Sequence, residues 1–254
     1  MKKLLHFIKK NCFLFIFTVF IIFVALFSFN KLFISKQTYI FAKVKIGQGL
    51  WWATTAEPPL WLVNSLSKPY EDPEAKVLKI NYYPVPISGI NSQLLSQDND
   101  QYNTYLTLKL KVTTSKNGSS YYFNRSMVAI GSPIDLDISN VQVSGTVVSF
   151  SKQPIKDEYI EKYIYITKEN PFAWEYEAIK IDDYYFDGEN KVFEVVGKEI
   201  VDNGNALTVK AKMRLKKVDN LLIFGEDRTI TVGKNISIFT NNFNFSNYTI
   251  SRID

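Results

Sequence analysis

The densest group of side chains that could do chemistry is acidic. It contains four carboxylates in one short run: Asp182, Asp183, Asp187 and Glu189. Two such groups facing a glycosidic bond can act as general acid and general base in glycan hydrolysis. Carboxylate oxygens also suit Ca²⁺, but the spacing does not match an EF-hand loop. The run is equally typical of a solvated turn, so we expect no catalytic residue and no metal site, and a carboxylate-based glycan hydrolase is the enzymatic alternative.

Other catalytic side chains are scarce. His6 is the only histidine and Cys12 is the only cysteine. Nucleophilic catalysis by Cys/His or Ser/His/Asp groups, and metal sites built from histidine or thiolate, need residues that the chain after Cys12 lacks. The segment Gly47-Gln-Gly49 is too short for a phosphate-binding loop and has no Lys-Ser/Thr ending. The sequence predicts a protein that is not an enzyme and has no cofactor.

The positive charge of the chain is concentrated near residue 1. The formal net charge is +5, from 30 basic and 25 acidic residues. Lys2, Lys3, Lys9 and Lys10 account for four of the basic residues, so the remainder has 26 against 25. Binding to nucleic-acid phosphates needs a clustered basic face, which a nearly neutral domain does not supply. We expect no nucleic-acid partner.

An uncharged apolar segment follows these four lysines. It covers residues 12–29, close to the roughly 20 residues that cross a bilayer as a helix. More positive charge precedes the segment than follows it, which places the N-terminus in the cytoplasm. The sequence predicts a cytoplasmic tail over 1–11 and a transmembrane helix over 12–34, with membrane lipid as a partner. The C-terminal remainder would then be extracytoplasmic.

A cleaved signal peptide is the alternative interpretation of this segment. The apolar region of a signal peptide typically spans about 7 to 15 residues and ends at small residues. Here the apolar region is longer, and bulky Phe27 and Phe29 lie at its end. We therefore expect the segment to be retained as a single-pass anchor in the cell membrane.

The remainder of the chain contains an internal repeat. Residues 130–145 align with residues 232–247 at a constant offset of 102, which pairs Gly131 with Gly233 and places Gly145 near the end of the matched segment. Glycine at such a position permits a positive φ angle or a close backbone approach. We expect these glycines to have structural roles in turns and strands.

Strand-like patterns support the repeat. Residues 106–112 and 207–213 align at an offset of 101, and both alternate apolar with polar or basic residues. Such alternation predicts strands with one face in the core and one in solvent. The sequence predicts two β-rich repeats, over 38–150 and 158–254.

Tryptophans mark a helix in each repeat. Trp61 and Trp174 each precede a small residue by four positions, so both residues share a helical face that could lie close on the sheet. Trp51 and Trp52 are adjacent, and neighbouring residues of a strand face opposite sides. One of these two tryptophans could therefore contact a partner while the other packs in the core.

Three segments also carry a family resemblance. The chain resembles an uncharacterised bacterial family of single-pass membrane-anchored proteins with a domain of unknown function. The matching segments are Ala42-Lys43-Val44-Lys45, Gly131-Ser-Pro-Ile134 and Ser144-Gly145-Thr146-Val147. The resemblance implies an anchored β-rich protein and assigns no catalytic residues.

The predicted fold class is β-dominated α+β, with an N-terminal transmembrane helix followed by two repeated β-rich domains that each contain a short helix. An anchor and a duplication without an active site favour a non-enzymatic scaffold or interaction module of the bacterial cell envelope. Its partners would be other proteins or further copies of itself. The alternative is an oligomeric module that binds or transfers a ligand or lipid, which would require an apolar cavity.

Overall fold

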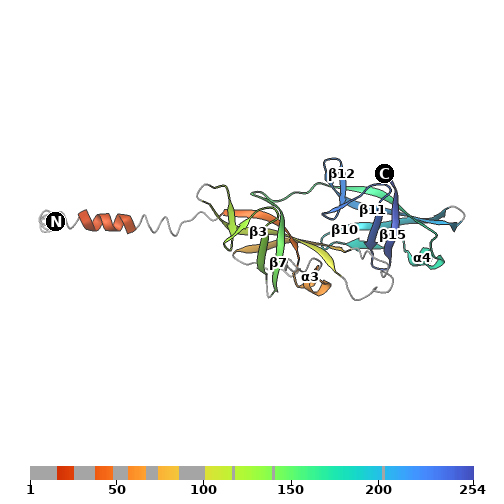
Figure 1. The fold of residues 1–254 in the computed structure, drawn as a ribbon, viewed down its shortest axis with the longest axis horizontal. Helices are drawn as coiled ribbons and strands as arrows, with labels where there is room; N and C mark the ends of the chain where they lie inside the picture. The colour runs from red at the N-terminus through yellow and green to blue at the C-terminus, as the bar shows by residue number, and fades with distance from the viewer. Residues whose placement is uncertain are drawn as a thin grey trace. The chain divides into compact units, whose positions relative to one another are not determined.

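The structure is a computed structural model that describes residues 16–25, 38–47, 57–66, 74–85, 101–115, 118–138, 141–201 and 204–254. The chain divides into two compact units, residues 1–38 and 39–254. Residues 16–25 of the first unit form a helix, and the second unit contains two antiparallel β-sheets (Figure 1).

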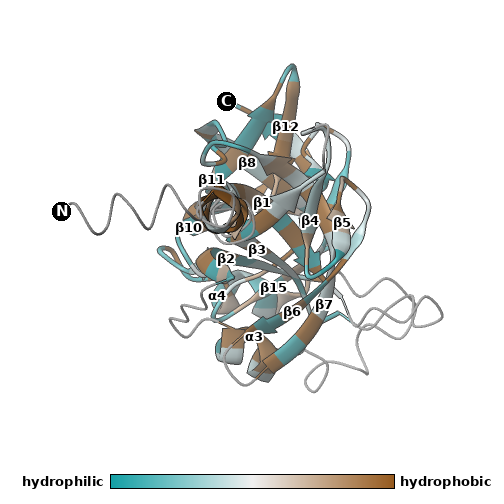
Figure 2. Ribbon diagram, turned by 90° about the vertical axis from the view of Figure 1, so that its left-hand side faces the viewer, coloured by the Kyte–Doolittle hydropathy of each residue, from teal (hydrophilic) through white to brown (hydrophobic). Residues whose placement is uncertain are grey.

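The predicted transmembrane helix over 12–34 is wrong in this structure. Of that span the structure describes residues 16–25, which form an exposed and mostly hydrophobic helix (Figure 2). Among the described residues, no helix is both long and apolar enough to cross a membrane. The predicted tail 1–11 and the rest of the span lie outside the described residues, and the extracytoplasmic placement of the remainder stays a prediction.

The first sheet has seven strands, and its main path runs in the order β5-β4-β3-β1-β7-β6, with β2 paired to β3. Its elements are β1 (Thr38–Ile46), α3 (Leu60–Leu66), β2 (Ala75–Pro84), β3 (Tyr102–Thr114), β4 (Tyr121–Phe123), β5 (Ser126–Val128), β6 (Pro133–Ile138) and β7 (Val141–Ser151). The helix α3 lies between the first two strands in the chain.

The second sheet has eight strands, and its main path runs in the order β13-β12-β11-β8-β15-β14, with β10 paired to β11 and β9 paired to β10. Its elements are β8 (Tyr159–Glu169), α4 (Ala173–Ala178), β9 (Tyr184–Phe186), β10 (Lys191–Val201), β11 (Ala206–Val218), β12 (Leu221–Phe224), β13 (Arg228–Thr229), β14 (Asn235–Phe239) and β15 (Asn244–Ile253). The helix α4 again lies between the first two strands.

The two sheets therefore have the same strand order. The strand β1 corresponds to β8, β3 to β11 and β7 to β15, while β9 has no counterpart among the described residues of the first sheet, which leave out 67–73. In each sheet the first strand pairs with the last one, so the chain closes back on its starting strand. The repeat found in the sequence predicts this shared topology.

Turns with matching hydrogen bonds precede β6 and β14. Gly131 has φ of 84° and Gly233 has φ of 86°, in the left-handed region that favours glycine. The Gly131 N–H donates to the Val147 carbonyl and the Gly233 N–H donates to the Ile250 carbonyl, each at 2.8 Å. The third repeat glycine, Gly145, has a different role. A Cβ there would lie 2.6 Å from the Lys45 carbonyl, so glycine permits β7 to approach β1 closely.

Side-chain alternation explains how β11 faces the core. Leu207, Val209, Ala211, Met213 and Leu215 are buried, whereas the residues between them are partly exposed. Period-two alternation places successive side chains on opposite faces of a sheet. One face of β11 thus enters the second core, and its other face presents basic side chains.

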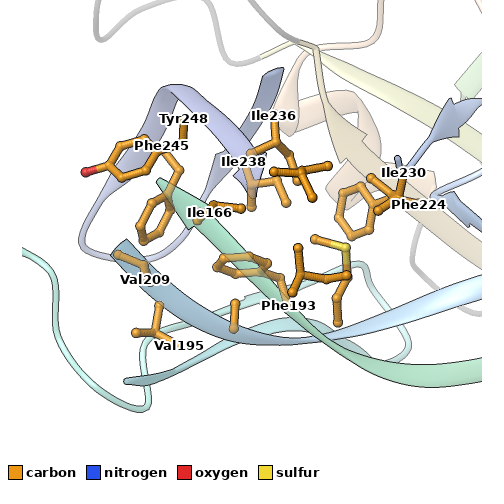
Figure 3. Close-up of a cluster of buried hydrophobic side chains, with 14 of the residues drawn as sticks. Ile166, Phe193, Val195, Val209, Phe224, Ile230, Ile236, Ile238, Phe245 and Tyr248 are labelled. Atoms are coloured by element: carbon orange, nitrogen blue, oxygen red, sulfur yellow. The ribbon is translucent and has the colours of Figure 1, made fainter. Parts of the chain in front are cut away.

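Each sheet packs against a hydrophobic core. Among the described residues, those in the core of the first sheet all come from β1 to β7 and α3. The second core contains Phe193, Phe245 and Tyr248, whose rings lie beside Ile166 and Val209 (Figure 3). It also includes Tyr83 and Tyr105 of the first sheet. The second core therefore depends on side chains that the first half supplies.

Candidate functional site at the junction of the two sheets

The carboxylates of the acidic run have separate structural roles. Asp183 is buried and accepts hydrogen bonds from the Thr240 hydroxyl, from the Asn242 N–H at 3.3 Å and from the Asn242 side-chain amide at 3.0 Å. Asp182 is exposed and has φ of 68°. Asp183 therefore anchors the loop between β14 and β15, and its hydrogen bonds fully account for its burial.

Asp187 joins the second half to the first. Its Oδ2 accepts hydrogen bonds from the Asn81 amide at 3.0 Å and from the Tyr83 hydroxyl at 2.9 Å. Its Oδ1 accepts from the N–H groups of Glu189 and Asn190, at 2.9 and 2.8 Å. This pattern is an Asx turn, so one buried carboxylate both shapes the β9–β10 turn and binds β2.

The predicted catalytic alternative needs two carboxylates facing one space. Asp183 and Asp187 instead contact different elements, and Glu189 forms an ion pair with Lys79 at 2.8 Å. Within the part of the chain that the structure describes, no cluster of three or more His, Cys, Asp or Glu side chains is placed to hold a metal ion. These contacts give the acidic run a structural explanation.

The backbone of the β9–β10 turn lies directly against β2. The Tyr82 N–H donates to the Asp187 carbonyl at 2.9 Å, and the Tyr185 hydroxyl donates to the Tyr82 carbonyl at 2.7 Å. Gly188, with φ of 100°, is in close contact with β2, because a Cβ there would lie 2.7 Å from the Tyr82 ring and 2.8 Å from the Ile80 carbonyl. Only glycine fits this contact without movement.

A buried charge cluster forms a second contact between the halves. It consists of Lys43 on β1, Asp157 in the connection between the sheets, Lys216 on β11 and Glu226 after β12. Lys43 Nζ lies 2.5 Å from Asp157 and 2.7 Å from Glu226, and Lys216 Nζ lies 2.7 Å from Asp157 and 3.0 Å from Glu226. The Lys43 and Glu226 side chains are only 5% and 8% exposed. Each lysine thus binds both carboxylates.

Titration of this charge cluster follows from its geometry. Burial alone would raise the pKa of Asp157, but hydrogen bonds from Lys216 and Lys43 and the charges of both lysines lower that pKa below its ordinary value. Burial alone would lower the pKa of Lys216, but its bonds to Asp157 and the charge of Glu226 raise it. Both shifts favour the ionised forms of Asp157 and Lys216 at every pH between the pKa of Asp157 and the pKa of Lys216.

Acid should weaken the cluster. A lowered carboxyl pKa contributes stability that is present above the unfolded pKa, about 3.9 for Asp, and is lost as the pH falls through the folded value. We expect the urea concentration at the unfolding midpoint of the wild type to decrease when the pH is lowered below about 4. Asp157→Asn should have a lower midpoint than the wild type at pH 7, and its midpoint should decrease less on acidification. Asp137→Asn, at an exposed position of β6, is the control. An equal acid dependence in wild type and Asp157→Asn would contradict the shift.

A polar pocket lies beside the charge cluster. Its volume is about 460 Å³, within the range of small-molecule sites. Residues from β1, β2, β3, the connection between the sheets, β8, the β9–β10 turn and β11 line this junction pocket: Lys43, Lys79, Asn81, Thr107, Ile155, Lys156, Asp157, Tyr159, Asp187, Glu189, Asn190 and Arg214. Neither half could form the pocket alone.

No protein-family model, curated protein or solved structure matches this chain. The family resemblance drawn from the sequence therefore stays a prediction.

The predicted tryptophan positions have different outcomes. Trp51 and Trp52 lie outside the described residues. Trp61 is the second residue of α3 and Trp174 the second of α4, but their side chains are 66% and 58% exposed. The prediction that this face lies on the sheet is wrong for α3, whereas in α4 Ala178 packs against the second core and the Trp174 ring lies 6.1 Å from that of Phe243. Leu62, Val63 and Leu66 form the buried side of α3, and sequence reasoning assigned none of them to it.

Proposed function

We propose that this chain is a non-enzymatic interaction module, in which two similar β-sheet units present the same contact residue twice. The observation that carries the proposal is the pair of exposed tryptophans at the same place in α3 and α4. Large aromatic side chains dominate the binding energy of many interfaces, and exposing them to water has no benefit for the fold. A protein partner that offers the same pocket twice fits this arrangement.

The surroundings of Trp174 support a contact role. Its ring stacks with that of Phe172 at a centroid distance of 6.3 Å and an interplanar angle of 11°, and Phe172 is also exposed, at 56%. On its other side Trp174 approaches Phe243 of the second core at 6.1 Å. The ring is thus partly held in place, which lowers the entropy lost when a partner binds.

The junction between the halves supports a two-site mode of binding. The Asp187 turn and the charge cluster join the two sheets through side chains that are mostly buried. Two contact residues on a preorganised body bind a repeated partner with a high effective concentration for the second contact. The rival function, lipid transfer, would need an apolar cavity, whereas polar and charged side chains predominate in the lining of the pocket at the junction.

Site-specific photo-crosslinking tests the proposal. A photoreactive phenylalanine analogue is placed at position 61, 174 or 221 of the full chain in the cells that produce it. We expect adducts of one common mass from positions 61 and 174, and none of that mass from position 221, where Leu221 is also half exposed. Trp174→Ala should lower the yield at position 61 severalfold, because the second contact is lost. Unrelated adducts at the two positions, or none, would refute the two-site module.

A further inference from the structure

The carboxylates of the junction pocket already have partners within the protein. Asp157 binds both lysines of the charge cluster, and Asp187 accepts four hydrogen bonds from side chains and from its own turn. Glu189, the third acidic group, is paired with Lys79. The acidic side of the pocket therefore has its partners within the protein.

Two cations of the pocket have no such partner. Neither Arg214 nor Lys156 forms an ion pair within the described residues. The Arg214 guanidinium lies 4.5 Å from the centre of the Tyr159 ring, and one of its nitrogens donates to the Asn190 amide oxygen at 2.6 Å. These contacts hold the guanidinium plane in place and leave other N–H donors free to bind an acceptor.

We propose that the junction pocket binds a small organic anion that carries hydroxyl groups, such as a sugar acid or a sugar phosphate. Arg214 binds the carboxylate or phosphate, since a fixed guanidinium can donate two parallel hydrogen bonds to either group. Lys156 adds positive charge at the exposed rim. The hydroxyl of Thr107 and the amide of Asn81 line the pocket and suit hydroxyl groups of the ligand.

This inference goes beyond the proposed interaction module and does not depend on it. The pocket lies at the junction of the halves, and its lining includes neither Trp61 nor Trp174. A ligand there would contact both halves at once. A negative crosslinking result would contradict the interaction module but not the anion-binding pocket. Absence of ligand binding would contradict the pocket but not the proposed role of the tryptophans.

Titration calorimetry with the full chain tests the pocket. The probes are glucuronate and glucose 6-phosphate, with glucose as the neutral control and inorganic phosphate as the anion without hydroxyl-bearing carbon. We expect saturable one-site binding of at least one anionic sugar, no binding of glucose, and weaker binding at high salt. Absence of saturable binding for both anionic sugars overturns the proposal. If phosphate binds as tightly as glucose 6-phosphate, the proposal that the pocket recognises an organic anion with hydroxyl groups is overturned.

Variants locate the bound anion. Arg214→Gln should weaken binding about tenfold, the effect of losing a charge-assisted hydrogen bond. Lys156→Gln, at an exposed position, should weaken it about twofold to threefold. Lys212→Gln removes the same charge two residues from Arg214 but outside the pocket, and should leave the affinity unchanged. Equal losses in Lys212→Gln and both pocket variants would show a general charge effect and refute the site.

Discussion

Replacing Lys43 with methionine should lower the free energy of unfolding by about 3 to 5 kcal/mol. Methionine keeps most of the length of the side chain but leaves Glu226, which is only 8% exposed, with Lys216 as its one cation. Breaking a buried ion pair from one side is costly because the remaining charge stays desolvated. Urea unfolding followed by tryptophan fluorescence measures the change.

Two further variants show whether burial causes this loss. Lys212→Met removes a lysine from an ion pair with Glu161 whose side chains are 38% and 60% exposed, and should move the urea midpoint little. The double variant Lys43→Met with Glu226→Gln should recover part of the stability, because it leaves Asp157 and Lys216 as a balanced pair. Equal losses for Lys43→Met and Lys212→Met would contradict a buried cluster.

Gly188→Ala should destabilise the protein by about 3 kcal/mol, through strain at positive φ and through overpacking against β2. The new Cβ would meet the Tyr82 ring and the Ile80 carbonyl, so the β9–β10 turn has to move away from the first sheet. That movement would also stretch the hydrogen bonds of Asp187 to Asn81 and Tyr83. Urea midpoints at pH 7 measure the loss.

Gly204→Ala is the matched control for this substitution. Gly204 has φ of 97°, close to that of Gly188, but a Cβ there would have no neighbour within 4 Å. It should cost only about 1 kcal/mol, the price of positive φ for a residue with a Cβ. The difference between the two variants isolates the contact with β2. If both glycines have the same effect, the junction is looser than the structure shows.

The β-rich character of the chain could be predicted because it depends on local pattern. Alternation such as that of Leu207, Val209 and Ala211 specifies which side of a strand is buried, whatever the strand pairs with. The turns at Gly131 and Gly233 could also be predicted, because glycine adopts a positive φ angle more readily than other residues. The repeat could be predicted because both halves contain the same strand patterns and the same glycine position.

The wrong predictions concern features that local pattern does not decide. Hydropathy at 12–34 indicates a transmembrane helix, yet no helix among the described residues is both long and apolar enough to cross a membrane. The spacing of Trp61 and Ser65 put both on one helical face but did not show which face the sheet covers. In α3 the aliphatic residues at 62, 63 and 66 are buried instead, and the Ser65 hydroxyl donates to the Trp61 carbonyl at 2.9 Å.

The junction could not be predicted from the sequence because its partners are far apart in the chain. Lys43 and Glu226 are separated by 183 residues, and Asn81 and Asp187 by 106. In an alternating strand Lys43 looks like any solvent-facing lysine. A register shift between Lys43 and Val44 in β1 accompanies its burial, and no simple sequence signal marks such an irregularity.

The presence of Tyr83 and Tyr105 of the first sheet in the second core implies an order of events during synthesis. Ribosomes release the N-terminal half first, and the first core is complete once β7 ends at Ser151. The partners of Tyr83, Tyr105 and Lys43 in the second half have not yet been synthesised at that point. At bacterial or eukaryotic elongation rates, synthesis from Ser151 to Glu226 takes on the order of ten seconds. During that interval the nascent first half exposes the surface that its twin later covers, and it is then most open to capture by a chaperone or by another unfinished chain.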